Sequence, residues 1–248
     1  MRSLLPTAES VDPLEVYAND ARPPWPDRPW LLLNMIASVD GGTHLDGRSG
    51  PLGGPADKRV FRAIRAVADL ILVAAGTVRS EQYHPVVVTP EVQAQRVARG
   101  QTPVPRLAIV TRHLDLDLDG ELLTGGVPPV LLTTAAAPEG RLRHAMARTA
   151  VERFDGERVD MVAALQRLTD HGARVVLCEG GPTLNGQLLA AGLLDEVCFT
   201  MSPMLVGGDA TRLVDPSSPF FRQDLALDRV LEEDGFLFTR YVRRETAR

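Results

Sequence analysis

From Trp30 onward, short runs of apolar residues alternate with segments whose apolar residues recur at helical spacing. Uninterrupted apolar runs of this length are typical of strands buried on both faces of a parallel sheet, and the segments between them suit the covering helices. The alternation therefore predicts an α/β fold with three α/β/α layers, a mostly parallel central sheet and an antiparallel C-terminal edge. We expect strands at 31–37, 70–75, 107–111, 130–133, 174–178, 196–201 and 236–242, and helices at 57–68, 159–170 and 183–191.

Residues 1–29 differ from the rest of the chain because prolines interrupt them and no hydrophobic period is sustained. The segment ends in RPPWPDRP at 22–29, a composition that favours an extended backbone. We therefore predict an extended N-terminal arm, 1–29, attached to a single domain, 30–248. With 44% hydrophobic residues in a chain of 248, that domain can bury a substantial core.

The composition predicts a cytoplasmic protein without a nucleic-acid or membrane partner. A formal net charge of −5 provides no basic surface for nucleic acid, and no apolar run is long enough to cross a bilayer. The first residues, MRSLLPTAES, lack the apolar core of a signal peptide, and two cysteines are too few for a disulfide framework.

The stretch CEGGPTLNGQLLAAG, residues 178–192, is the most distinctive strand end. An apolar run stops at Glu179, two glycines follow, and Pro182 suits the first position of the next helix, where a backbone N–H is not needed. Glycines let the backbone approach a ligand closely, and the free N–H groups of a helix start favour an anion. The stretch therefore predicts a phosphate site beside Glu179.

Four other predicted strands also end in unusual residues. Each is a weak signal alone, because an Asp-Gly pair is commonly a turn and a Gly-Thr pair a helix cap. Ligands of open α/β sheets bind beyond the carboxyl ends of the strands, so the recurrence favours one shared site. No GxGxxG fingerprint is present, and the standard dinucleotide turn is not expected. The four ends are NMIASVDGG at 34–42, GTVR at 76–79, TR at 111–112 and PMLVGG at 203–208.

In order and spacing, NMIASVDGG (34–42), FRAIRAVADLILVAAGTVRSE (61–81), EGGPTLNGQLL (179–189) and SPMLVGG (202–208) resemble the pyrimidine reductases of riboflavin biosynthesis. The resemblance covers about residues 30–245 and implies a dihydrofolate-reductase-like fold. It also implies an NADPH-dependent enzyme, usually a homodimer, that reduces 5-amino-6-(5-phosphoribosylamino)uracil to its ribitylamino product. In bacteria this reductase is commonly fused to a zinc deaminase, whose His-x-Glu and Pro-Cys-x-x-Cys ligands are missing from this sequence. We therefore expect a stand-alone reductase or a relative with an altered substrate.

The resemblance implies that NADPH lies along several strand ends. The N–H groups and the hydroxyl at 76–77 would hold pyrophosphate oxygens, and the 180–184 loop would lie against the phosphates. Arg112 would grip the 2′-phosphate, which is the basis for preferring NADPH to NADH, with a surface role as its alternative. Glu81 would lie near the cofactor, or be a solvated acid in the first turn of a helix. The implied cofactor residues are Ala37, Gly76, Thr77, Val78, Glu81, Thr111, Arg112, Gly180, Gly181, Pro182, Thr183 and Leu184.

The substrate residues implied by the resemblance are Asn34, Ser49, Arg65 and Glu179. The Glu179 carboxylate can accept hydrogen bonds from pyrimidine N–H groups, and Arg65 would hold the phosphate unless it is a solvated surface residue. Family members often carry Trp two residues after the serine, where this chain has Pro51. The pocket wall, and with it the substrate, can therefore differ.

Asp40 and Glu179 are the predicted catalytic residues. Hydride transfer to an imine carbon needs a proton at nitrogen, or an iminium held beside a carboxylate, and Asp40 suits either role if burial raises its pKa. The alternative for Asp40 is a structural Asp-Gly turn. The cofactor carries the chemistry while the protein positions it. The five histidines lack ligand spacing, so no metal is expected.

Two other functions stay open at this point. The same fold could reduce a related pterin such as dihydrofolate, although Arg65 with Ser49 favours a phosphorylated substrate. A chain of a different class, a non-catalytic paralogue, would bind NADPH without turning anything over.

Overall fold

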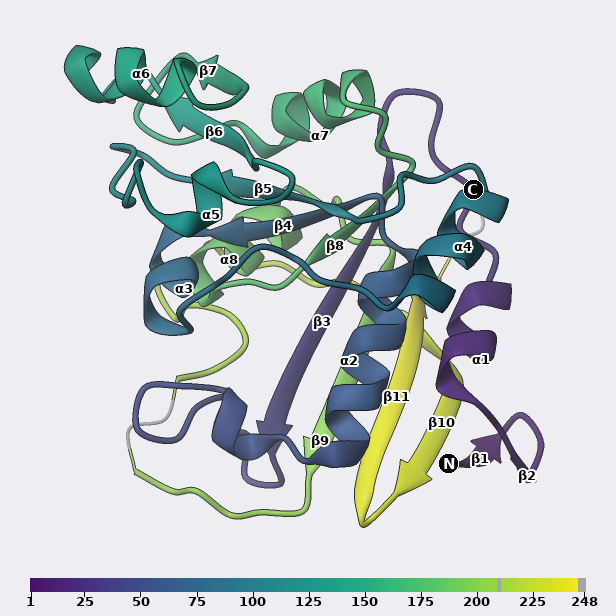
Figure 1. Ribbon diagram of the computed structural model, residues 1–248. Helices are drawn as coiled ribbons and strands as arrows, with labels where there is room; N and C mark the ends of the chain where they lie inside the picture. Colours follow the sequence, from purple (N-terminus) through teal and green to yellow (C-terminus); the bar gives the residue numbers. More distant parts are fainter. Residues whose placement is uncertain (209–210, 245–248) are drawn as a thin grey trace.

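One sheet of eleven strands organises the chain (Figure 1). The computed structural model describes residues 1–208 and 211–244. Along the sheet the strands follow the order β2-β1-β10-β11-β9-β3-β8-β4-β5-β6-β7. The strands from β9 to β7 in this order run parallel, whereas those from β2 to β11 pair antiparallel and join β9 antiparallel. The predicted mostly parallel sheet with an antiparallel edge is confirmed.

The strands are β1 (Arg2–Leu5), β2 (Glu9–Ser10), β3 (Trp30–Ser38), β4 (Leu70–Ala74), β5 (Arg106–Val110), β6 (Val130–Thr134), β7 (Val151–Phe154), β8 (Val175–Cys178), β9 (Glu196–Ser202), β10 (Leu225–Glu233) and β11 (Phe236–Arg243). The helices are α1 (Pro13–Asn19), α2 (Pro55–Val67), α3 (Ala75–Ser80), α4 (Pro90–Ala98), α5 (Glu121–Thr124), α6 (Glu139–Met146), α7 (Met161–Asp170) and α8 (Pro182–Ala190), with a 3-10 turn η1 (Gly50–Leu52). Each predicted strand and helix lies within two residues of an observed one. None of the helices in the described part of the chain is long and apolar enough to cross a lipid bilayer.

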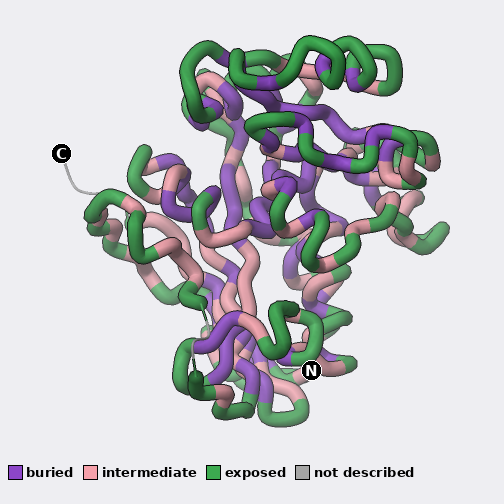
Figure 2. Tube along the Cα trace, turned by 90° about the vertical axis from the view of Figure 1, so that its left-hand side faces the viewer, coloured by how far each residue is buried: buried purple, intermediate pink, exposed green. Residues whose placement is uncertain are grey.

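Alternate residues of the parallel strands enter two cores, one on each face of the sheet. Leu32 and Ile71 belong to the core to which α2, α3 and α6 contribute. Leu31 and Leu72 belong to the core to which α7 and α8 contribute. Figure 2 shows the buried segments running through the middle of the molecule, with exposed loops around them. Because helices cover both faces, the strands read as uninterrupted apolar runs, and this is why the sequence located them.

The N-terminal segment is not the extended arm that we predicted. β1 pairs antiparallel with β10 and β2, and α1 begins at Pro13 after Asp12, whose carboxylate accepts a hydrogen bond from the Leu14 N–H. Tyr17 of α1 is 1% exposed and belongs to the same core as α2. The prediction was wrong because prolines were interpreted as interruptions, whereas Pro13 is a favourable first residue of a helix. The boundary at residue 29 stays a prediction.

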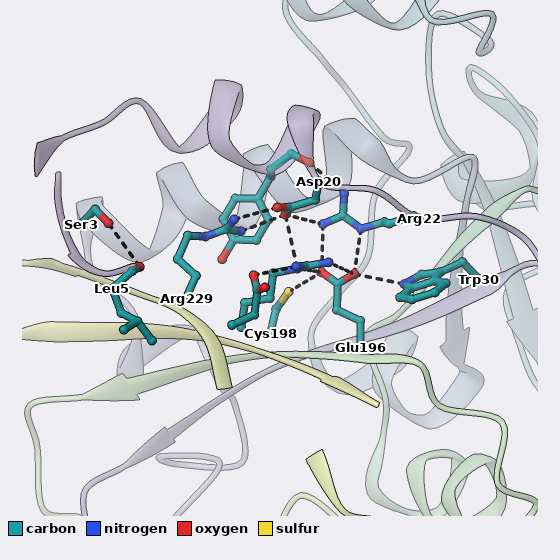
Figure 3. Close-up of polar contacts among 11 residues, drawn as sticks. Ser3, Leu5, Asp20, Arg22, Trp30, Glu196, Cys198 and Arg229 are labelled. Atoms are coloured by element: carbon teal, nitrogen blue, oxygen red, sulfur yellow. Dashed lines mark hydrogen bonds and ion pairs between the residues drawn. The ribbon is translucent and has the colours of Figure 1, made fainter. Parts of the chain in front are cut away.

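A buried network of charges joins this segment to the sheet (Figure 3). Arg22 donates to both carboxylate oxygens of Glu196, at 2.8 Å each, and also to Asp20. Arg240 donates to Glu196, and Arg229 donates to Asp20. Burial opposes the charged form of Glu196, but Arg22 and Arg240 hold the pKa of its carboxyl at about 2. Residues before the first parallel strand thus supply charges that neutralise arginines of the sheet.

Candidate functional site

A cavity of about 440 Å³ lies between α2 and the carboxyl ends of β8 and β4. Residues from several separate segments of the chain line it, as expected for an α/β protein whose ligand binds beyond its strands. The residues predicted from sequence that it brings together are Asn34, Ser49, Arg65, Thr77, Glu81 and Glu179. We call this the candidate-site cavity.

Glu179, directly after β8, is held from two sides inside this cavity. Its carboxylate accepts hydrogen bonds from Arg65 Nε and Nη2, each at 2.7 Å, and from the Tyr83 hydroxyl at 2.5 Å. The Arg65 guanidinium in turn lies over the Phe61 ring, 4.3 Å from its centroid. Burial disfavours the charge on Arg65, yet the adjacent Glu179 carboxylate raises its pKa. The alternative interpretation of Arg65 as a solvated surface residue is therefore wrong, because its guanidinium group donates two hydrogen bonds to Glu179.

Tyr83 is a neutral donor to the same carboxylate. Burial and the neighbouring charge of Glu179 raise the pKa of its phenol well above the ordinary value. The phenol thus keeps its proton and donates it to the hydrogen bond with Glu179. The Arg65–Glu179–Tyr83 triad fixes the direction of one carboxylate within the cavity.

The glycine turn after β8 lies against the start of α3. The carbonyl of Gly180 accepts a hydrogen bond from the Ala74 N–H at 2.7 Å, and the peptide between Gly180 and Gly181 is cis. A Cβ added to Gly181 would lie 2.8 Å from Thr77 Oγ1. The turn therefore leaves a space beside Thr77 that a larger residue would fill. Two predicted cofactor segments, 76–78 and 180–184, are adjacent for this reason.

Several predicted cofactor residues face inward. The side chains of Ala37, Val78 and Leu184 are buried, and Val78 and Leu184 belong to the two cores. Only the backbone at these positions is suited to meet a ligand. Thr183, in the first turn of α8, donates its hydroxyl to Asp215, and the Asp215 N–H donates to the Pro182 carbonyl. The segment around Asp215 therefore lies against the start of α8.

Thr111 and Arg112 follow β5, which pairs with β4 in the sheet. The Thr111 hydroxyl accepts a hydrogen bond from the Asp115 N–H at 3.2 Å. Arg112 donates to Glu157 at 3.0 Å, and both side chains are exposed. In this structure Arg112 lies at the surface, as the alternative interpretation has it. Its role toward a 2′-phosphate stays a prediction.

Glu81 lines the candidate-site cavity together with Thr77, and its role near a cofactor stays a prediction. It caps the carboxyl end of α3 and does not lie in the first turn of a helix. Its carboxylate accepts a hydrogen bond from the backbone N–H of Ser49 at 2.7 Å. Glu81 thus holds the turn η1, which contains Pro51, at the mouth of the candidate-site cavity.

Asp40 is not buried, although burial was the condition for its role as a proton donor. It is exposed and accepts hydrogen bonds from the Ser38 hydroxyl at 2.5 Å and from the N–H groups of Gly207 and Val206, at 2.7 and 3.1 Å. The hydroxyl and the two backbone N–H groups lower the pKa of its carboxyl to about 2. It also lines a different cavity, of about 900 Å³, beside the 212–221 segment. The condition for a catalytic Asp40, a pKa raised by burial, is not met, and the structural-turn alternative describes its surroundings.

Sequence reasoning missed three residues of the candidate-site cavity. Phe61 falls within the predicted helix 57–68 without a predicted role, yet its ring lies under the Arg65 guanidinium at the cavity wall. Tyr83 follows α3 without any periodic signal, and Asp57 was read only as a helix start. A polar residue on the cavity side of a helix has no local signature, because its neighbours come from β3 and β9.

Glycine turns at the ends of parallel strands, beside a cavity that carries carboxylate, guanidinium and phenol groups, are the arrangement of an α/β protein that binds a small ligand beyond its strands. Within 1–208 and 211–244, no three potential ligands from His, Cys, Asp or Glu gather into a metal-binding cluster.

The chain belongs to the RibD C-terminal domain family, which matches residues 29–230. It is 31% identical over 189 residues to the 2,5-diamino-6-ribosylamino-4(3H)-pyrimidinone 5′-phosphate reductase of Methanothermobacter thermautotrophicus, covering 76% of this chain and 84% of that protein. The protein of the same name from Archaeoglobus fulgidus is 28% identical over 197 residues, covering 79% and 90%. A solved pyrimidine reductase-like protein from Corynebacterium diphtheriae matches with a TM-score of 0.84 and 25% identity, covering 95% of this chain and 100% of that one. The predicted family, and a reductase as the class of enzyme, are confirmed.

Proposed function

We propose that this chain is an NADPH-dependent reductase of a 6-ribosylaminopyrimidine 5′-phosphate, whose ribosyl group becomes ribityl. The observation that carries the proposal is the carboxylate of Glu179, fixed by Arg65 and Tyr83 in a cavity beside the glycine turn. A fixed carboxylate is suited to accept hydrogen bonds from the N–H groups of an aminopyrimidine.

The relatives refine the choice of pyrimidine. Two relatives are named as reductases of the 2,5-diaminopyrimidinone, and the match covers 84% and 90% of their lengths. The resemblance seen in the sequence instead implied the corresponding aminouracil. The two compounds differ in the substituent at ring position 2. We therefore propose the diaminopyrimidinone as the first substrate to test.

Membership of a reductase family suggests a nicotinamide cofactor, and the residues present fit one. The space beside Thr77 that a Cβ on Gly181 would fill is suited to a phosphate, and the first turns of α3 and α8 provide free N–H groups around it. Gly76, Thr77, Gly180 and Gly181 would hold the pyrophosphate. Arg112 at the end of β5 favours NADPH over NADH. When bound, the nicotinamide supplies a hydride to the substrate.

Side chains of the candidate-site cavity then position the pyrimidine substrate. Glu179 orients the pyrimidine ring, while Arg65 and Tyr83 prevent the carboxylate from rotating away. The side chain of Asn34, on β3, lies on the same cavity wall and can pair with a ring carbonyl or amide. The homodimer and the cytoplasmic location implied by the resemblance also remain proposals.

Purified protein should oxidise NADPH in the presence of the ribosylaminopyrimidine phosphate, as followed by NADPH absorbance. The diaminopyrimidinone, the aminouracil and dihydrofolate should be assayed in parallel, and NADH should serve as the cofactor control. We expect the highest kcat/KM with a phosphorylated pyrimidine. Activity with dihydrofolate alone would make the protein a pterin reductase, and NADPH binding without any turnover would make it a non-catalytic paralogue.

Replacing Gly181 by alanine should weaken NADPH binding by about tenfold, the loss of roughly one hydrogen bond to a charged group. The added methyl group would lie 2.8 Å from Thr77 Oγ1 and force this hydroxyl to move within the phosphate space. Titration of nicotinamide fluorescence measures the effect. Gly140→Ala, in α6, is the matched control, because nothing lies within 4 Å of a Cβ there. Equal affinities for the two variants would contradict the assigned phosphate site.

A further inference from the structure

Asp57 is an acid of the candidate-site cavity that has no place in the function described so far. It lies in the first turn of α2 and lines the cavity together with Asn34 of β3 and Thr200 of β9. A Cβ added to Gly53 would lie 2.5 Å from Asp57 Oδ2, so the glycine provides the room in which this carboxyl group lies. The carboxyl group is therefore accommodated by its surroundings.

The other two carboxylates of the cavity are already engaged. Glu179 is held by Arg65 and Tyr83, and Glu81 accepts the N–H of Ser49. In the described part of the chain Asp57 makes no ion pair, and Thr200 lines the same cavity. In the described part of the chain it is the acid of this cavity whose carboxyl group is held neither by a salt bridge nor by a backbone N–H.

The surroundings of Asp57 favour its protonated form. Burial raises the pKa of its carboxyl above the ordinary value of 3.8, although the Thr200 hydroxyl and the charge of Lys58 oppose the shift. The other ionisable groups that line the same cavity are Lys58, Arg65, Glu81, Tyr83, His84 and Glu179. Two of these groups are cations. Lys58 is the residue next to Asp57 in the sequence, and the guanidinium of Arg65 already donates two hydrogen bonds to Glu179. The pKa of Asp40, the residue considered as proton donor from the sequence, is lowered instead, and Asp40 lines another cavity.

We propose that Asp57 is the catalytic acid of this site and gives its proton to the nitrogen of the C=N bond that is reduced. The inference rests on the proposed function. A hydride from the nicotinamide cofactor adds to the carbon, and the π electron pair of the C=N bond moves to the nitrogen. The nitrogen takes the proton from Asp57, which is left as a carboxylate and is reprotonated from water.

Asp57→Asn should lower kcat with the ribosylaminopyrimidine phosphate by about 100-fold or more, the usual range for a lost general acid. NADPH affinity should stay within about threefold of the unchanged protein, because the phosphate space lies at the glycine turn. In the unchanged protein kcat should fall as pH rises through the pKa of Asp57, and this limb of the profile should be absent from the variant. Asp170→Asn, at the exposed carboxyl end of α7, is the matched control.

A second measurement does not depend on activity. Since the pKa of Asp57 is raised by folding, its carboxyl group favours the fold below about pH 4, and this contribution is lost as pH rises through the raised pKa. The Tm of Asp57→Asn should therefore rise relative to that of the unchanged protein as pH increases from 4 to 7. A Tm difference that does not change with pH would overturn the inference.

The activity outcomes separate the two proposals. If the unchanged protein turns over the pyrimidine and Asp57→Asn retains at least a third of that rate, Asp57 is not the catalytic acid, whereas the proposed function stands. If the unchanged protein binds NADPH but reduces no pyrimidine phosphate, the proposed function fails and the role of Asp57 fails with it. Loss of turnover in Asp57→Asn alone, with the pH limb removed, supports both.

Discussion

Replacing Glu196 by glutamine is expected to lower the free energy of unfolding by roughly 3–5 kcal/mol, the cost of removing one partner from a buried ion pair. Glu196 is 0% exposed and accepts hydrogen bonds from Arg22, Arg240 and the Trp30 indole N–H. Glutamine would leave two guanidinium groups with one anion fewer in a region that water does not reach. Urea denaturation measures the change, and for a chain of this size Tm should fall by about 10 °C.

The matched control is Glu139→Gln, whose partner Arg153 and own side chain are both exposed. An exposed pair of this kind contributes about 0–1 kcal/mol, so the two variants should differ clearly. The folded-state pKa of Glu196, about 2, lies below its ordinary value of 4.5, so its contribution is present above about pH 4.5 and is lost as pH falls toward 2. The glutamine variant should lack this loss. A stability change as small as that of the control would mean that Asp20 alone neutralises the arginines.

The parallel core was predictable because its signal is local. A strand buried on both faces must be apolar at every position, and a helix on its face must repeat near 3.6 residues, so each is visible within its own sequence window. The N-terminal elements lack such a signal. β1 is a strand because Arg2 pairs with Glu232, and α1 is stable because Tyr17 enters a core built by other segments. Contacts with segments far away in the sequence leave no mark on the local pattern.

The candidate site, like the fold, was predictable in part. The residue types at the strand ends, glycines and a carboxylate, could be predicted because strand topology brings those ends together. Their environments could not be predicted, since burial and charge partners come from distant segments. Asp40 and Asp57 illustrate this difference: both are acids near glycines, yet the first is exposed with a lowered pKa and the second is partly buried with a raised one. The pairing of Arg65 with Glu179, 114 residues apart, was missed for the same reason.

Arg65→Met and Glu179→Gln are each expected to lower kcat/KM for the ribosylaminopyrimidine phosphate by about 100-fold, which corresponds to roughly 3 kcal/mol. Glu179→Gln removes the carboxylate that would accept the pyrimidine N–H groups. Arg65→Met leaves that carboxylate buried with the Tyr83 hydroxyl as its remaining donor, free to rotate or to take up a proton. Steady-state kinetics of both single variants and of the double variant complete a thermodynamic cycle.

The double variant distinguishes the two roles that Arg65 can have. If Arg65 acts by positioning Glu179, the double variant should be about as active as either single variant, because the second change removes an interaction already lost. If Arg65 binds the substrate phosphate independently, as the family resemblance implies, the two losses should multiply to about 10,000-fold. The exposed pair Arg148 and Asp119, changed to Met and Asn, controls for changes in charge elsewhere on the protein. The bidentate contact with Glu179 favours the first outcome, since a guanidinium fork that already faces one carboxylate has to give up that contact before it can face a phosphate.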